Sequence, residues 1–193
     1  SVAYIQAHAE SIHGARVLLI QQEASLDASL EALCIAKAAG VLCIVNPAPA
    51  NAKAGELHTM ADVLTPNESE FAALLHAHGE TLSADFIEQC DADTLHALAR
   101  KLLCQNVVIT LGARGAILST PGGFQTFPAP KVRVVDTTGA GDCFNGALAA
   151  ELANGAPLPQ ACAFAVKASA CKVERAGAAL AMPNRLEIAA RFG

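Results

Sequence analysis

Hydrophobic residues along the chain form two patterns: short continuous apolar runs, and longer stretches in which they recur at helical spacing. The short runs predict buried strands, because parallel strands covered on both faces read as nearly uninterrupted apolar segments. The predicted strands are Ala15–Ile20, Val41–Val45, Ala61–Leu64, Asn106–Leu111 and Lys131–Val135, with a hairpin of Ala116–Ser119 and Phe124–Phe127. The predicted helices are Ala3–Ile12, Leu26–Ala39, Asn67–Ala77, Asp91–Cys104, Gly141–Asn154, Leu158–Arg175 and Asn184–Phe192. Strands that alternate with helices indicate an α/β fold with helices on both faces of a parallel sheet.

Polar residues follow the predicted strands at their carboxyl ends, where ligands of open parallel sheets bind. One such residue or pair comes after each of the first five strands. In chain order they are Glu23, Asn46, Asn67 with Glu70, Gly112 and Asp142. This convergence predicts a ligand site along one edge of the sheet.

The stretch Val134–Leu148 places a glycine-rich turn before a helix, with Asp142 in the first helical turn. Such a turn presents backbone N–H groups and the positive end of the helix dipole, which favour an anion. It lacks the third glycine of a dinucleotide fingerprint, where Phe144 stands, and the Lys-Ser/Thr of a Walker loop, where Ala147-Leu148 stand. The alternative is a structural turn in which Asp142 interacts only with the helix dipole.

Two further motifs have both structural and functional interpretations. Asn67 and Glu70 fit a helix cap with a first-turn acid, and they also fit a magnesium site reached through water. Thr110–Gly115 fits a turn into a hairpin, and its small residues would also let a nucleotide approach the backbone.

Composition narrows the function classes. The 193 residues are 53% hydrophobic and 16% charged, which predicts a globular domain. A net charge of −5 argues against a nucleic-acid surface, and no apolar run approaches the length of a membrane span. Seven cysteines without CxxC pairs predict buried free thiols in a reducing cytoplasm. The mean hydropathy of +0.37 suggests an apolar face covered by another part of the protein.

The glycine turn and four earlier motifs resemble, in order, those of the ribokinase-like (PfkB) carbohydrate kinases. The motifs are Leu18–Glu23, Asn46–Ala50, Thr65–Glu70, Thr110–Gly115 and Asp136–Leu148. The resemblance implies a three-layer α/β/α sandwich with a mostly parallel sheet. It implies ATP- and Mg²⁺-dependent phosphorylation of a sugar hydroxyl, most simply ribose to ribose 5-phosphate, in a cytoplasmic homodimer.

The resemblance also assigns residues to the phosphoryl transfer. Asp142 would be the general base, and the amides of Gly139, Ala140, Gly141 and Asp142 would form the anion hole. Asn67 and Glu70 would hold the triphosphate and the magnesium waters. The nucleotide loop would be Thr110, Gly112 and Gly115.

For the sugar, the resemblance implies a hydrogen bond to the carboxylate of Glu23. For a monovalent cation, usually potassium, it implies a loop that contains Asp136 and Thr138. The remaining ligands of this loop, mostly backbone carbonyls, would be those of Lys172, Arg175 and Gly177. The family has a serine ligand where this chain has Ala181, which weakens the potassium assignment.

The resemblance leaves out the family's N-terminal portion, which carries most sugar contacts and the lid strands. Residues 1–193 are therefore expected to be the C-terminal nucleotide-binding and catalytic portion, inactive or nearly so alone. The missing portion would come from a longer protein or a separate chain. The alternative is a non-catalytic remnant that binds a nucleotide or a partner but has no sugar site. The sugar itself is left open by the sequence.

Overall fold

The computed structural model describes residues 1–51 and 54–193, which form two compact units. The first unit contains Ser1–Leu111 and Ile117–Gln125, and the second contains Gly112–Ala116 and Thr126–Gly193. No helix in these described ranges is long and apolar enough to cross a membrane.

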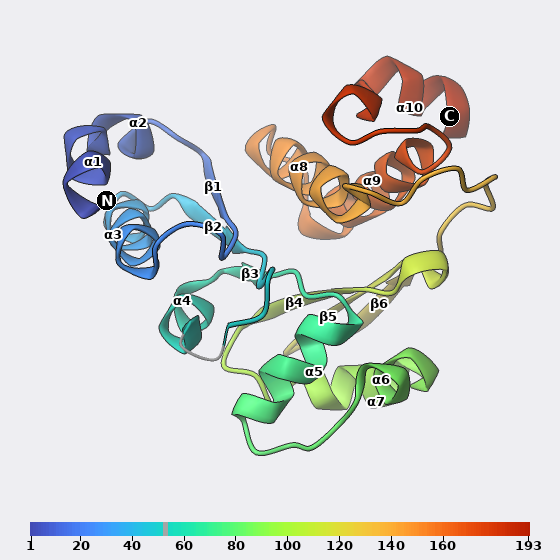
Figure 1. The fold of residues 1–193 in the computed structure, drawn as a ribbon, viewed down its shortest axis with the longest axis horizontal. Helices are drawn as coiled ribbons and strands as arrows, with labels where there is room; N and C mark the ends of the chain where they lie inside the picture. The colour runs from blue at the N-terminus through green and yellow to red at the C-terminus, as the bar shows by residue number, and fades with distance from the viewer. Residues whose placement is uncertain (52–53) are drawn as a thin grey trace. The chain divides into compact units, whose positions relative to one another are not determined.

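A six-stranded sheet runs in the order β1-β2-β3-β4-β5-β6 (Figure 1). Its first four strands are parallel, with Val17 opposite Leu42 and Leu64 opposite both Val45 and Val107. The short links on either side of β5 make it antiparallel to its neighbours, because parallel neighbours need a long crossover. The strands are β1 (Val17–Ile20), β2 (Leu42–Val45), β3 (Val63–Leu64), β4 (Asn106–Thr110), β5 (Ala116–Thr120) and β6 (Gly123–Phe127).

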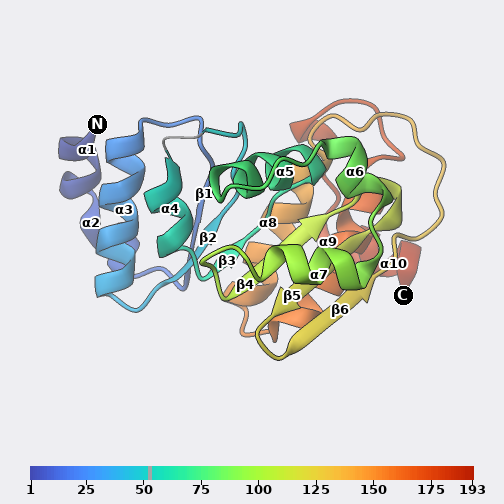
Figure 2. The same cartoon turned by 90° about the horizontal axis from the view of Figure 1, so that it is seen from below.

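The helices of the first unit connect these strands and bury their apolar sides. Leu33 of α3, Phe71 of α5 and Leu95 of α7 are almost completely buried in one cluster with strand residues such as Val45 and Ile109. Figure 2 shows α3 and α4 side by side next to β1 and β2. The helices are α1 (Val2–Ala7), α2 (Ala9–His13), α3 (Leu26–Ala38), α4 (Gly55–Met60), α5 (Glu68–Ala77), α6 (Ala84–Gln89) and α7 (Ala92–Ala99).

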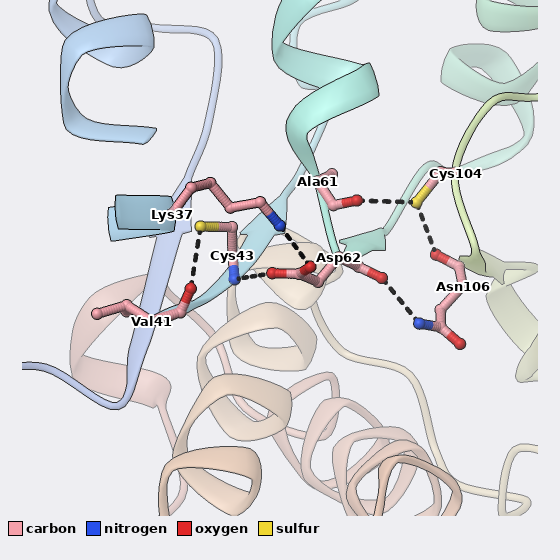
Figure 3. A network of polar contacts seen from close by, with 7 residues as sticks. All are labelled: Lys37, Val41, Cys43, Ala61, Asp62, Cys104 and Asn106. Atoms are coloured by element: carbon pink, nitrogen blue, oxygen red, sulfur yellow. Dashed lines mark hydrogen bonds and ion pairs between the residues drawn. The ribbon is translucent and has the colours of Figure 1, made fainter. Parts of the chain in front are cut away.

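A polar network joins the amino ends of β2, β3 and β4 (Figure 3). The Asp62 carboxylate accepts a hydrogen bond from the Cys43 backbone N–H at 2.8 Å and another from Lys37 Nζ. The Asn106 side-chain amide donates to the Asp62 carbonyl at 2.9 Å. The Cys104 thiol lies 3.4 Å from the Ala61 carbonyl. These contacts connect the three strand starts at the edge of the sheet opposite the predicted site.

The second unit consists mainly of three helices, α8 (Ala140–Ala153), α9 (Leu158–Lys172) and α10 (Arg185–Phe192). Two single 3₁₀ turns, η2 (Gly112–Arg114) and η3 (Ala179–Ala181), also belong to it. Most buried residues of α9 are alanine or cysteine, and this small-residue surface packs closely against α8. Ile188 of α10 packs with Cys143 and Cys171 in a second apolar cluster.

One predicted strand is wrong: Lys131–Val135 is irregular in the structure. The side chains of Val134 and Val135 are 60% and 54% exposed, and no described strand pairs with this segment. The Val135 N–H instead donates to the Val173 carbonyl at 2.7 Å, just after α9. Alternating valines and basic residues suit any extended chain, so the pattern alone did not identify a sheet partner. The other predicted strands, the hairpin and six of the predicted helices are confirmed with shifted ends. The predicted helix Ala3–Ile12 is instead two short helices, α1 and α2, that meet at His8, and α4 and α6 were not predicted.

Candidate functional site

The glycine turn opens α8 in a conformation that requires glycine. Gly139 is the residue before the helix and has φ 74° and ψ 11°, in the left-handed region. This region costs an L-residue with a side chain about 1–2 kcal/mol. The helix that follows is 14 residues long, so its N-terminal N–H groups and dipole favour an anion in front of the turn.

The N–H groups of this turn differ in their partners. The Ala140 N–H donates to the Thr137 carbonyl at 3.0 Å, and the Cys143 N–H donates to the Gly139 carbonyl at 2.9 Å. Of the amides predicted to bind an anion, Ala140 therefore already has a partner inside the turn. A ligand would have to share or displace that hydrogen bond.

The Asp142 side chain is exposed in the first turn of α8. Its Oδ2 lies 3.7 Å from the position that a Cβ on Gly139 would occupy, so the carboxylate lies over the glycine turn. The Met182 Cε lies 3.2 Å from the same position. An exposed carboxylate over a helix N-terminus can accept a proton close to a bound anion, and it also interacts favourably with the dipole.

Two side chains that sequence reasoning missed support the first turn of α8. The buried Asn145 donates from Nδ2 to the Gly141 carbonyl at 3.0 Å. The Ser169 hydroxyl, from α9, donates to the Ala140 carbonyl at 3.0 Å. Both hydrogen bonds hold carbonyls of the predicted anion-binding residues. The sequence signal that could have identified these two residues is a polar side chain within an otherwise apolar helical stretch.

The structure brings together most residues of the predicted cation loop. Asp136 Oδ1 accepts the Thr138 N–H at 2.9 Å and Oδ2 accepts the Gly177 N–H at 2.8 Å. Hydrogen bonds from Thr138 and Gly177 lower the pKa of Asp136 to about 2. The Lys172 Nζ donates to the Asp136 carbonyl at 2.9 Å. The Arg175 side chain points elsewhere, to Glu187 at 2.8 Å.

In the first unit, Asn67 and Glu70 form a complete capping box at the start of α5. Asn67 Oδ1 accepts the Glu70 N–H, and Glu70 Oε2 and Oε1 accept from the Asn67 backbone and side-chain amides, each at 2.9 Å. Burial raises the pKa of Glu70, and the hydrogen bonds from Asn67 oppose that shift. Asn67 and Glu70 therefore do form the helix cap with a first-turn acid that the sequence suggested. A magnesium water could still use the remaining lone pairs of the carboxylate.

Polar side chains do converge at the carboxyl ends of β1, β2 and β3. The buried Asn46 donates to the Thr65 carbonyl at 2.8 Å and accepts from the Gln21 side chain at 3.4 Å. Thr110, at the end of β4, donates its N–H to the Pro66 carbonyl at 2.9 Å, directly before the α5 cap. Within the described ranges, no group of three or more His, Cys, Asp or Glu residues could hold a metal ion directly.

Glu23 lies exposed in the turn after β1. The turn is fixed by its neighbour Gln22, whose N–H donates to the Ala48 carbonyl at 2.8 Å and whose side-chain amide donates to His58. Burial, with a smaller contribution from His78, lowers the pKa of His58 to about 4. The neutral His58 ring can therefore accept from Gln22. No pattern in the sequence indicated this pair.

The two glycines of the predicted nucleotide loop have different surroundings. Gly112 has φ +50° and open space around its Cβ position, as a ligand-facing glycine requires. Gly115 has φ +94°, and a Cβ there would lie 1.9 Å from the Phe127 carbonyl oxygen. The close approach at Gly115 is therefore to the chain's own backbone.

Residues 3–185 match the pfkB family carbohydrate kinase model, and the chain therefore belongs to that family. It is 36% identical over 191 residues to the ribokinase of Schizosaccharomyces pombe. The aligned region covers 98% of this chain and 59% of that protein. The fold class predicted from the sequence is confirmed by two solved structures.

The Thermotoga maritima ribokinase structure is 33% identical, with a TM-score of 0.77, over 94% of this chain and 58% of that one. The Arabidopsis thaliana ribokinase complexed with ribose and ATP is 28% identical, with a TM-score of 0.80, over 95% and 58%. The chain thus spans less than two thirds of the length of these relatives.

Proposed function

We propose that residues 1–193 are the nucleotide-binding and catalytic portion of an ATP-dependent kinase that converts ribose to ribose 5-phosphate. The observation that carries this proposal is the left-handed Gly139 turn at the start of α8, with the Asp142 carboxylate lying over it. The names of the relatives support the substrate, and one of them is described in complex with ribose and ATP. The cytoplasmic location and the homodimer remain predictions from the family resemblance.

In this proposal Asp142 removes the proton from the attacking sugar hydroxyl. A positioned base of this kind contributes a factor of about 10²–10⁴ to the rate. The amides of Gly139, Ala140, Gly141 and Asp142 stabilise the charge of the transferring group, for which the open N-terminus of α8 is suited. The Ala140 amide joins them once it leaves the Thr137 carbonyl.

The nucleotide would lie along Asn67, Thr110, Gly112 and Gly115. The open space at Gly112 allows close contact with a ligand, whereas the role of Gly115 is to let the loop pack on residues 127–129. Magnesium would supply charge neutralisation on the phosphates. Glu70 fits its hydration shell only through water, because both of its oxygens already accept hydrogen bonds from Asn67.

For the sugar, this chain would contribute Glu23. Because it spans 59% of the S. pombe ribokinase, we propose that further sugar contacts come from residues outside the chain, in the same polypeptide or a separate one. The 193-residue chain alone is then expected to transfer phosphate to ribose slowly.

The test compares Asp142→Asn with Asp27→Asn, an exposed first-turn carboxylate at the start of α3 and hence a matched control for the helix dipole. ATP affinity is measured by calorimetry, and ribose-dependent transfer is measured with γ-phosphate-labelled ATP over long incubations. We expect Asp142→Asn to keep ATP binding and to lose transfer by at least about 100-fold. Asp27→Asn should leave both unchanged.

Near-normal transfer by Asp142→Asn would refute the base assignment. If the wild-type chain binds ATP but shows no ribose-dependent transfer even when the remaining part of the enzyme is supplied as a separate chain, the alternative of a non-catalytic nucleotide-binding remnant is supported instead. Failure to bind ATP would refute the proposed function.

A further inference from the structure

Lys172 is a fully buried lysine at the last position of α9. Its Nζ donates to the Asp136 carbonyl at 2.9 Å, three residues before the Gly139 turn. Removing an ammonium from water is costly unless nearby groups compensate its charge. A buried lysine at this place therefore calls for a compensating negative environment.

That environment is present in the same unit. The carboxyl end of a helix carries partial negative charge, and Lys172 lies in the last turn of α9. The Asp136 carbonyl and the carboxyl end of α9 thus stabilise a cation at this place, and the lysine supplies that cation.

The segment containing Asp136 is joined to the end of α9 at several points. The Val135 and Asp136 N–H groups donate to the Val173 carbonyl at 2.7 and 3.2 Å. The Gly177 N–H and Lys172 Nζ donate to the Asp136 carboxylate and carbonyl. These bonds fix the backbone immediately before the glycine turn.

The oxygens of this loop do not fit a bound potassium ion, because several of them already accept hydrogen bonds. Among the backbone carbonyls of the predicted loop, that of Lys172 accepts the Arg175 N–H at 3.0 Å. The Asp136 carbonyl already accepts the ammonium, and the two Asp136 carboxylate oxygens accept the N–H groups of Thr138 and Gly177. Hard cations need several oxygen ligands, and the buried Ala181 has none in its side chain.

We propose that the Lys172 ammonium takes the place of a monovalent cation in this loop, so that the protein needs no potassium. Lys172 is then a positioning residue, which acts on the anion-binding turn through the Asp136 carbonyl. Its consequence for catalysis rests on the proposed kinase function, whereas its effect on cation dependence of stability does not.

The experiment measures thermal unfolding of the 193-residue chain in KCl and in choline chloride at equal ionic strength. The wild-type midpoint should agree in the two salts within about 1 °C, since the site is filled internally. Lys172→Ala should lower the midpoint in choline chloride by about 3–12 °C, through loss of a buried charged hydrogen bond. KCl should restore part of that loss with a saturating concentration dependence, because an ion that binds only the folded state stabilises it.

Two further variants separate this role from simple packing. Lys172→Met fills the space without the charge, so it should be destabilised in both salts. Lys167→Ala is the matched control, because Lys167 also lies on α9 and donates to a backbone carbonyl, that of Phe192 at 3.2 Å. It should show no potassium response.

A wild-type midpoint that rises saturably with potassium but not with choline would overturn the proposal, even if Lys172→Ala does not fold. A folded Lys172→Ala without a potassium response would overturn it as well. Neither outcome depends on ATP binding or phosphate transfer, so failure of the proposed function is recognised separately.

Discussion

Gly112 and Gly115 belong to one loop, and alanine at each position distinguishes a ligand-facing glycine from a packing glycine. Both have positive φ, +50° at Gly112 and +94° at Gly115. A Cβ at Gly112 meets nothing within 4 Å, whereas at Gly115 it would lie 1.9 Å from the Phe127 oxygen and 2.6 Å from the Ala129 nitrogen. The two substitutions therefore share one cost and differ in another.

The shared cost is the left-handed backbone, about 1–2 kcal/mol for an L-residue. Gly115→Ala adds a collision with backbone atoms that cannot rotate away, and overpacking of this kind costs about 1–3 kcal/mol. We therefore expect losses in the free energy of unfolding of about 1–2 kcal/mol for Gly112→Ala and about 2–5 kcal/mol for Gly115→Ala. The larger loss is a substantial part of the 5–15 kcal/mol typical of a folded domain.

Urea unfolding followed by circular dichroism gives both free energies, and calorimetry gives ATP affinity for the variants that remain folded. Gly112→Ala should weaken ATP binding more than its small loss of stability explains, because its Cβ would project into the open space. Equal losses of stability at the two positions would refute the close-approach reasoning. Unchanged ATP affinity in Gly112→Ala would refute its nucleotide role.

Two other predictions concern stability. Asp62→Ala should lower the free energy of unfolding in urea by about 1–3 kcal/mol, because the Cys43 N–H loses its carboxylate acceptor. Lys37→Ala should lower it by under about 1 kcal/mol, because it removes only an exposed ion pair. Equal losses in the two variants would contradict this reasoning. The pKa of His58 is about 4 in the folded state and lies at the ordinary histidine value of 6.5 in the unfolded state, so the unfolded state binds more protons between these values. Stability should therefore fall by about 1–2 kcal/mol as the pH drops from 7.5 to 4.5, allowing for partial exposure. His58→Asn should flatten this dependence and the exposed control His76→Asn should not; an unchanged slope in His58→Asn would disprove the assignment.

Much of the fold was predictable because buried parallel strands and capped helices have strong local signals. The apolar run Val41–Val45 contains β2, and Asn67 caps α5 as its side chain suggested. The short helices α4 and α6 were missed, since six residues are too few to establish a periodicity.

The candidate site was predictable in part for a related reason. Residues that follow strands directly, such as Asn46 and Asn67, could be assigned to one edge of the sheet from chain order alone. Contacts between distant segments could not: nothing local connects Lys172 to Asp136 or Ser169 to Ala140. The family resemblance supplied roles for Asp136 and Lys172, but the ammonium-to-carbonyl contact emerged only from the structure.

The seven cysteines form no disulfide, and only Cys34 is exposed. Burial raises the thiol pKa of Cys43 and Cys143 to about 11 and that of Cys162 to about 12, so thiolate is scarce in the folded chain. Three buried thiols belong to each compact unit: Cys43, Cys90 and Cys104 in the first, and Cys143, Cys162 and Cys171 in the second. The buried thiols can therefore report on unfolding of each unit separately. Brief alkylation followed by peptide mapping would show in which unit the cysteines become accessible first.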